Sequence, residues 1–450
     1  MRVLFPYLAR WHSANWSRYH HLLGALAARG HEVVVLQAPP RPEARETNYL
    51  EIGGPAAPGI EVLDVPVPAA LWRRRFPLDK LVKKGLVALA TRRAVAAVAR
   101  ERQIDVLLLY NVPQVVLARA TQATVVVDLA DDLLAMLAHE AGPWVRPFAL
   151  PAARLALRSL RAAADLVITP SSVLAEQLGA GVQIVPNGAD LAATARADGN
   201  AVRARYPGPI VGFVGAFEYF VDFDLVLDTA ARLPRCSFVL VGGGRDWVCV
   251  RAAAQRRGLA NVYCPGPVDY ATALEHMAAF DVALAPFVAD AVGDAASPLK
   301  LFEYGALRRP VLCTPTTEIR RIAGAWAHFG ATTADWAAGI EAILAAPAAA
   351  GERAEAGAAA IVARYRWDHI AAGLERLILD RWRGRVGGSE TTSELGQMER
   401  ATARAPGGAG RVGGEPPRDG TALHVERDLA SGREAALPGT AGRRTGERAP

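Results

Sequence analysis

Short runs of apolar, often β-branched residues alternate with helix-length segments along most of this chain, and this alternation constrains its fold most. Such runs predict buried strands, and the segments between them predict helices. In the first half, strands are expected at RVLFPYL (2–8), EVVVLQA (32–38), IEVLDVPV (60–67), VLLLY (106–110), TVVVDL (124–129), LVITPS (166–171) and QIVPNGAD (183–190). Helices are expected at 17–31 and from about 77 to 102. Strands and helices in this order indicate a parallel sheet covered on both faces.

The second half begins the same pattern again. Strands are expected at PIVGFVGAF (209–217), CSFVLVGGG (236–244), NVYCPGPV (261–268), DVALAPF (281–287) and PVLCTP (310–315). Helices are expected around 222–233, 247–258, 270–279, 298–308 and 316–324, and an amphipathic last helix at 366–382. Two successive α/β sheets predict two Rossmann-like lobes, residues 1–190 and 191–365, that face each other across a central cleft. Ligands of such sheets bind beyond the carboxyl ends of the strands.

Composition separates the folded part of the chain from its end. Hydrophobic residues make up 51% of the 450 residues and charged residues 21%, which is ordinary for a globular protein. From about residue 384 the chain is rich in Gly, Pro, Arg and Glu and has few large apolar residues. Such a segment buries too little surface to offset chain entropy, so 384–450 is predicted to be a disordered tail.

Several classes of partner and site are not expected. The net charge of +6 is modest and does not gather in one tract, so no nucleic-acid partner is predicted. The four cysteines form no CxxC pair, which indicates reduced thiols and no metal site. The N-terminus has too short an apolar core for a signal peptide, and no run reaches the roughly 18 apolar residues of a membrane span. We therefore expect a cytoplasmic protein without a cofactor.

Two charged residues stand out in an apolar helix. The stretch SPLKLFEYG (297–305) predicts a helix with Ser297 as its N-cap and Pro298 at its first position. Lys300 and Glu303 are three residues apart and therefore lie on one face near its start. A helix N-terminus with a Lys suits a phosphate, and a Glu one turn deeper could accept hydrogen bonds from ribose. The alternative is an ordinary exposed Lys–Glu pair.

SPLKLFEYGALRRPV (297–311) resembles the donor-site signature of the GT-B glycosyltransferases, especially the group 1 or family 4 type. Further stretches resemble segments of the same family in the same order, namely 5–36, 164–190 and 211–244. The resemblance covers about residues 1–383. It implies an acceptor-binding domain at 1–190, a nucleotide-sugar-binding domain at 191–365 and a helix at 366–383 that returns to the first domain.

The resemblance assigns a donor site. In the family, the Glu that matches Glu303 holds the ribose, and the basic residue that matches Lys300 holds the diphosphate. The implied donor-binding residues are Gly215, Gly243, Ser297, Pro298, Leu299, Lys300 and Glu303. Two departures stand beside them: Ala295 replaces a Glu that many retaining members carry, and GAFEYFVDFD (215–224) lacks their basic residue. Retention of anomeric configuration is therefore not inferred.

Acidic residues at the end of a predicted strand are the candidate catalytic groups. DLADD (128–132) places Asp128, Asp131 and Asp132 where a carboxylate could deprotonate an acceptor hydroxyl. Asp128 is the first candidate and Asp132 the second, and the alternative is a loop with a helix N-cap. No His or Glu completes a metal site at these aspartates. Donor binding is expected to be metal-independent, because the helix start at 297–300 and the Lys300 ammonium group can together neutralise the diphosphate.

Two other segments remain open in function. In the loop after the first strand, Trp11, His12 and Asn15 could bind the acceptor sugar, with Trp16 beside them, or His12 could be an ordinary loop residue. LWRRRFPLDKLVKKGL (71–86) mixes basic and large apolar residues. It is either a solvated basic helix face or a peripheral contact with the inner face of the membrane.

The sequence thus predicts transfer of a sugar from a nucleotide-sugar donor to a hydroxyl of a polysaccharide, glycolipid or secondary metabolite. The expected partners are this donor and a glycan or lipid-linked acceptor. One alternative is a nucleotide-sugar epimerase of the same fold. The other is a degenerate, non-catalytic nucleotide-sugar-binding protein, which Ala295 and the missing basic residue favour.

Overall fold

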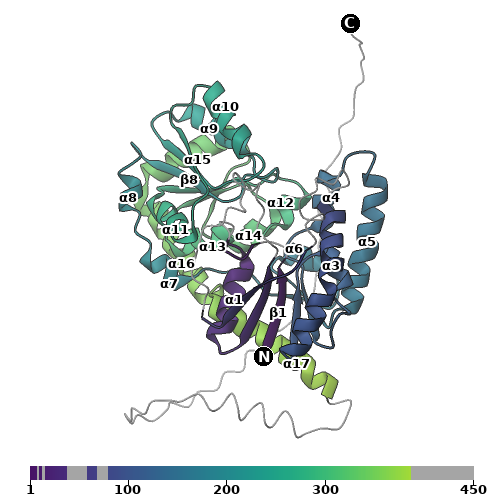
Figure 1. Ribbon diagram of the computed structural model, residues 1–450. Coiled ribbons are helices and arrows are strands. Elements are labelled where there is room, and N and C mark those ends of the chain that lie inside the picture. Colours follow the sequence, from purple (N-terminus) through teal and green to yellow (C-terminus); the bar gives the residue numbers. More distant parts are fainter. Residues whose placement is uncertain (8–9, 13–15, 38–57, 68–79, 387–450) are drawn as a thin grey trace, which may run out of the picture. The chain divides into compact units, whose positions relative to one another are not determined.

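Two parallel sheets and the helices around them make up the computed structural model, which describes residues 1–7, 10–12, 16–37, 58–67 and 80–386 (Figure 1). Of the predicted disordered tail 384–450, residues 384–386 belong to the last helix, and the remainder lies outside the described residues, as do Asn15 and most of the basic segment 71–86. The predicted α/β class with two successive parallel sheets is confirmed. The boundaries expected between lobes, at 190 and 365, remain predictions.

The first sheet has the strand order β3-β2-β1-β4-β5-β6-β7, with every pair parallel. Its strands are β1 (Arg2–Tyr7), β2 (Glu32–Gln37), β3 (Ile60–Asp64), β4 (Val106–Leu109), β5 (Thr124–Asp128), β6 (Leu166–Thr169) and β7 (Val182–Ile184). The order reverses between β1 and β4, which is the topological switch point where ligands of such sheets bind.

The helices of this half follow the strands in turn. They are α1 (Arg18–Ala28), α3 (Lys80–Glu101), the 3-10 helix η1 (Val112–Val116), α4 (Leu133–Glu140), α5 (Arg146–Ala163) and α6 (Ser172–Leu178). The inner strands β2, β1, β4, β5 and β6 are buried along almost their whole length, as a sheet covered on both faces requires, whereas the edge strands β3 and β7 are mostly half-buried.

The second sheet repeats the topology with the order β10-β9-β8-β11-β12-β13, again all parallel. Its strands are β8 (Ile210–Val214), β9 (Ser237–Val241), β10 (Val262–Gly266), β11 (Val282–Ala285), β12 (Val311–Cys313) and β13 (His328–Phe329). Its switch point lies between β8 and β11.

The remaining helices connect these strands or follow them. They are α7 (Leu191–Arg196), α8 (Asn200–Arg203), α9 (Phe223–Arg232), α10 (Trp247–Arg256), α11 (Tyr270–Ala279), α12 (Ala291–Ala295), α13 (Leu299–Ala306), α14 (Thr317–Ala323), α15 (Thr333–Ala345), α16 (Pro347–Arg364) and α17 (Trp367–Val386).

Each strand expected from the sequence is present, and the one expected within 183–190 covers Val182–Ile184. The elements that were not predicted individually are η1, α4 to α8, α12, β13, α15 and α16. In α12, the N-cap Asp290 accepts a hydrogen bond from the Gly293 amide.

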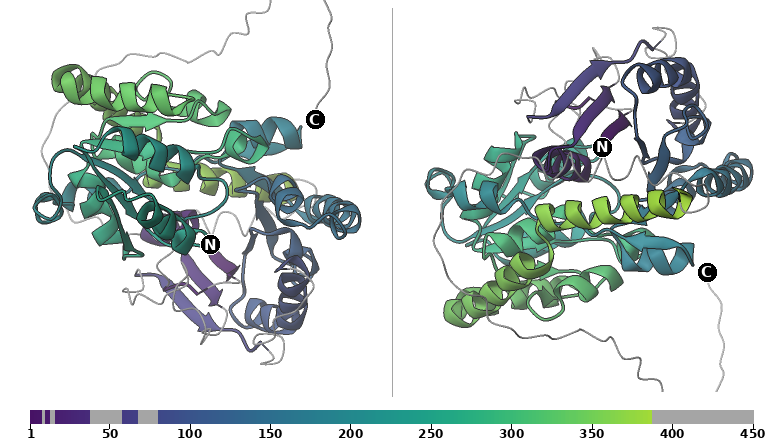
Figure 2. Two further views of the ribbon diagram at one scale, coloured as in Figure 1. Left: turned by 90° about the horizontal axis from the view of Figure 1, so that it is seen from above. Right: turned by 90° about the horizontal axis from the view of Figure 1, so that it is seen from below.

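The last helix completes the core of the first sheet. Its residues Trp367, Ile370, Ala371, Leu374 and Ile378 are buried in one cluster with side chains of β1, β2 and α1. Along this helix α17 contacts α1 (Figures 1 and 2). The Trp367 ring stacks on the ring of His21 at a centroid distance of 5.2 Å. The chain therefore returns to its first sheet after it has built the second.

Trp367→Ala should lower the free energy of unfolding by roughly 3 kcal/mol, because the change removes a buried aromatic side chain and leaves a cavity. Urea denaturation followed by circular dichroism measures this cost. His369→Ala is the matched control, since His369 lies two residues away on the same helix and is exposed. Equal, small effects of the two variants would contradict the packing described for α17.

Candidate functional site

Glycines let three loops meet at the carboxyl ends of β8, β9 and β10. A Cβ atom on Gly242 would lie 1.9 Å from the carbonyl oxygen of Gly215. A Cβ atom on Gly244 would lie 2.4 Å from the carbonyl oxygen of Phe217. The buried Gly243 accepts a hydrogen bond from the Phe217 amide at 3.0 Å. Only glycine at 242 and 244 permits this close approach of backbones.

Lys300 of α13 reaches the switch point of the second sheet. Its Nζ atom lies 4.1 Å from the ring centroid of Phe213 in β8 and 5.2 Å from that of Phe287, which follows β11. A Cβ atom on Gly215 would lie only 2.5 Å from this Nζ, so glycine makes room for the ammonium group. Among the described residues Lys300 Nζ makes no hydrogen bond or ion pair. The ammonium group thus has aromatic neighbours and the space that Gly215 leaves beside it.

Glu303 lies one turn further along α13 and is 5% exposed. Burial raises the pKa of Glu303 to about 7, against the opposing influence of the Tyr270 hydroxyl and Lys300. Burial likewise lowers the pKa of Lys300 to about 7, although Glu303 raises it. Burial thus disfavours both charges, and an anionic ligand would restore the charge of Lys300.

The start of α13 differs from the prediction by one residue. Pro298 is the N-cap, and Ser297 precedes the helix without capping it. The Ser297 hydroxyl is buried without a partner among the described residues, whereas its carbonyl oxygen accepts a 2.6 Å hydrogen bond from the Asn187 side chain. The expectation that Ser297 caps the helix is therefore wrong, because its backbone is bound to a loop of the first half instead. Leu299, the first helical residue, packs against the core of the first sheet.

Arg18 connects the loop that holds Ser297 to the first sheet. Its Nε atom donates a 2.7 Å hydrogen bond to Asp128 Oδ2, and both side chains are almost completely buried. Its Nη atoms donate to the Val185 and Pro186 carbonyl oxygens and to Asn187 Oδ1, at 2.7 to 2.9 Å. One guanidinium group therefore ties the end of β5 to the loop after β7. Asn187 continues the connection to Ser297.

The two candidate catalytic aspartates occupy different environments. Asp128 is 0% exposed, and burial raises its pKa although Arg18 lowers it; its Oδ1 atom has no partner among the described residues. Asp132 is half-buried and caps α4 by accepting hydrogen bonds from the Leu134 and Ala135 amides. A general base must reach the proton it removes. In this structure Asp128 holds Arg18, and of the two carboxylates only that of Asp132 is partly open to solvent.

The residues expected at the acceptor loop form a stack of rings. The Trp11 ring is 2% exposed and stacks on His20 at 4.0 Å, so neither of its faces is open to a sugar. Trp16 stacks on the other side of this series, against His20 at 4.4 Å and against Tyr270 of α11 at 5.6 Å. His12 is half-buried. Burial lowers the pKa of His20 to about 4, so the stack is uncharged near neutral pH.

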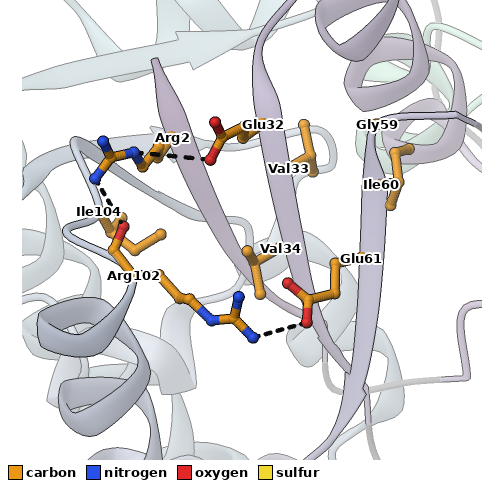
Figure 3. Close-up of a pocket in the computed structure, with 9 residues that line it drawn as sticks. All are labelled: Arg2, Glu32, Val33, Val34, Gly59, Ile60, Glu61, Arg102 and Ile104. Atoms are coloured by element: carbon orange, nitrogen blue, oxygen red, sulfur yellow. Dashed lines mark hydrogen bonds and ion pairs between the residues drawn. The ribbon is translucent and has the colours of Figure 1, made fainter.

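A cavity of about 350 Å³ lies at the other end of the first sheet (Figure 3). It is lined by the first residues of three strands, Arg2, Glu32 and Ile60, so it lies at the amino ends and away from the candidate site. Its charged residues form the ion pairs Arg2–Glu32 and Arg102–Glu61 (Figure 3). Its charges are thus already compensated.

Within the described residues, no group of three His, Cys, Asp or Glu side chains could hold a metal ion. No helix in this part of the chain is long and apolar enough to cross a membrane.

Arg18→Met should lower the free energy of unfolding by about 3 kcal/mol or more, because it leaves the Asp128 carboxylate buried without its partner. The double variant Arg18→Met/Asp128→Asn should cost at least about 1 kcal/mol less than the sum of the two single variants. The exposed pair Arg308–Glu355 is the control, with a coupling of no more than about 0.5 kcal/mol. Additive effects at Arg18 and Asp128 in urea denaturation would contradict the described network.

Two family models match successive parts of the chain. The model of the glycosyl transferase 4-like domain matches residues 16–189, and that of glycosyl transferases group 1 matches residues 208–346. These ranges contain most of the first and of the second sheet, respectively.

Two curated relatives match shorter stretches. The putative teichuronic acid biosynthesis glycosyltransferase TuaH of Bacillus subtilis is 29% identical over 136 residues, which are 30% of this chain and 34% of TuaH. The O-antigen chain mannosyltransferase C of Escherichia coli is 46% identical over 57 residues, 13% of this chain and 15% of that protein. The matches thus span 34% and 15% of the length of these relatives.

Solved structures share the fold along nearly the whole described chain. Sucrose-phosphate synthase from Thermosynechococcus elongatus has a TM-score of 0.68 at 16% identity, over 86% of this chain and 100% of that one. HepE from Anabaena, in complex with UDP-glucose, has a TM-score of 0.61 at 17% identity, over 84% of this chain and 100% of that one. The chain therefore carries a glycosyl transferase 4-like domain followed by a glycosyl transferases group 1 domain, in the two-sheet GT-B fold of these solved structures.

Proposed function

We propose that the protein transfers a sugar from a nucleotide-sugar to a hydroxyl group of a glycan or a lipid-linked acceptor. The observation that carries this proposal is the Lys300 ammonium group. It lies at the switch point of the second sheet without a hydrogen-bonding or ionic partner among the described residues, and Gly215 leaves room beside it. An unpaired cation next to a glycine-lined loop suits the diphosphate of a nucleotide.

The donor would lie on α13 with its diphosphate at Lys300 and its ribose at Glu303. The glycines at 215 and 243 line the loops beside it, and the start of α13 adds the partial positive charge of a helix N-terminus. HepE, which shares the fold, binds UDP and UDP-glucose. Because Lys300 and the helix can neutralise the diphosphate, we propose that donor binding needs no divalent metal.

The acceptor would bind at the carboxyl ends of the first sheet, opposite the donor. There its hydroxyl oxygen attacks the anomeric carbon, the bond from that carbon to the diphosphate breaks, and a base takes the hydroxyl proton. Asp132 is the more accessible of the two candidate bases, whereas Asp128 supports the site through Arg18. Both curated relatives are named for polysaccharide assembly, which supports a glycan as acceptor.

Release of nucleoside diphosphate should depend on an acceptor. We expect a purified sample, supplied with a panel of nucleotide-sugars and glycan or glycolipid acceptors, to release the diphosphate together with a glycosylated product. Release without acceptor, accompanied by an epimerised sugar, would instead identify the epimerase of the same fold. Tight nucleotide binding without any release across the panel would identify a binding protein.

Lys300→Ala should weaken binding of a nucleoside diphosphate by roughly ten- to a hundredfold and leave binding of the free nucleoside nearly unaffected. The nucleoside diphosphate to be used is the one that stabilises the protein most. Charged hydrogen bonds contribute about 1.5–3 kcal/mol each, and only the diphosphate contacts this ammonium group. Glu303→Ala should weaken both ligands, because both contain the ribose. Calorimetric titrations in EDTA measure these affinities. Binding that needs magnesium or manganese would contradict the proposed metal-free site.

Lys300→Arg serves as the matched control, because it keeps the positive charge at every accessible pH. The pKa of Lys300 is lowered to about 7, so its charge is present below about pH 7 and is lost as the pH rises. The preference for the diphosphate is the dissociation constant of the nucleoside divided by that of the nucleoside diphosphate. This ratio should therefore fall above pH 7, by up to roughly tenfold per pH unit. In Lys300→Arg this ratio should stay flat. An equal pH dependence in both proteins would assign the effect to another group.

A further inference from the structure

Large apolar side chains are exposed in a row at the start of α5. Trp144 is 88% exposed, Phe148 78% and Leu155 64%, and Val145 is also exposed. Trp144 and Val145 directly precede α5, and Phe148 and Leu155, which are seven residues apart within it, lie along one side of the helix. In Figure 1, α5 lies at the right-hand edge beside α4. No described residue covers this row.

The opposite side of α5 is already packed. Ala153 and Leu160 are buried, the first against Leu137 and Ala141 at α4 and the second in the core beside the first sheet. The exposed row is therefore a second apolar face that the fold itself does not use.

Arginines flank this face, and no acidic residue accompanies them. The segment from Ala141 to Ala164 contains Arg146, Arg154, Arg158 and Arg161 and no Asp or Glu. None of the four makes an ion pair with a described residue, and Arg146, Arg154 and Arg158 are exposed. The segment carries a formal charge of +4 from these residues. It thus presents unpaired positive charge next to exposed Trp, Phe and Leu.

We propose that residues 144–161 form a docking surface for an anionic lipid bilayer, with α5 lying in the interface. Interfacial helices combine Trp, Phe and Leu on one face with Lys or Arg beside them, which is the pattern of this helix. Arginines attract anionic headgroups, and Trp is favoured at the interface. A second copy of the chain fits less well, because a symmetric contact through this face would oppose like-charged arginines.

The surface is also close to the candidate site along the chain. It follows directly on α4, whose N-cap is Asp132 and whose last residue is Glu140. Glu140 forms an ion pair with Arg245 of the loop after β9. A bilayer held at Trp144 would thus lie near the end of the helix that Asp132 begins. An acceptor embedded in that bilayer would have a short path to the site.

Vesicle sedimentation of the full-length protein tests the proposal. We expect binding to vesicles of phosphatidylcholine with about a third phosphatidylglycerol, little binding to phosphatidylcholine alone, and weaker binding at high salt. Arg154→Gln/Arg158→Gln should weaken binding by about thirtyfold, since each basic residue near such a surface contributes roughly fivefold. Trp144→Ser/Phe148→Ser should weaken it by about tenfold or more.

Control variants remove the same charge, or two exposed apolar side chains, elsewhere. Arg232→Gln/Arg256→Gln and Val248→Ser/Val362→Ser alter exposed residues outside the first sheet and its helices, and should bind vesicles as the unmodified protein does. Brominated lipid should quench tryptophan emission, and Trp144→Phe should lose part of that quenching. Because all altered residues are exposed, thermal midpoints should stay unchanged.

Three results would overturn the proposal: equal binding to phosphatidylcholine alone, unaltered binding of both α5 variants, or a dimer that Trp144→Ser/Phe148→Ser converts to monomer. The last would assign the face to a second copy.

Binding to vesicles is measured without donor, and the stabilisation of the protein by nucleoside diphosphate should be the same in the α5 variants. A failure of the docking surface is thus distinguishable from a failure of the proposed transferase activity.

Discussion

The guanidinium group of Arg18 is almost completely buried, and several parts of the structure depend on how its charge is compensated. Asp128 supplies the opposite charge, and the loop after β7 supplies two carbonyl oxygens and the Asn187 side chain. A buried ion pair is retained at a cost in desolvation, so good geometry and full hydrogen bonding are required. In return it fixes α1, β5 and the loop after β7 with respect to one another. Through Asn187 and Ser297 it also sets where α13 begins, and hence where Lys300 lies.

Much of the fold could be predicted from local sequence patterns, because buried strands of a parallel sheet are continuous apolar runs bounded by polar residues. The missed helices show the limit of that approach. In α16 the buried positions are Ala350, Ala354, Ala358 and Ile361, and alanine gives little contrast between a buried and an exposed face. The two-residue strand β13 is too short for any periodicity. These elements are specified by packing against neighbours that only the folded chain supplies.

The residues of the candidate site also fall into those that a local pattern reveals and those that only the folded chain brings together. Lys300 and Glu303 could be identified because they lie three residues apart in an apolar helix, which is a local signal. Arg18, Asn187 and Tyr270 could not, since Arg18 meets Asp128 across 110 residues and Asn187 meets Ser297 across 110 residues. Trp11 illustrates the opposite error. An aromatic residue in a loop suggests a sugar platform, but its ring is covered by His20 and the core.

The return of α17 to the first sheet has a consequence for biosynthesis. Domains of a nascent chain generally fold in order from the N-terminus as they leave the ribosome. Here the core around β1 lacks Trp367, Ile370, Leu374 and Ile378 until translation has passed them. The second sheet, by contrast, has all its strands once Phe329 has emerged. The N-terminal half of this protein is thus begun first and finished last, and part of its apolar core stays uncovered while the second half is synthesised.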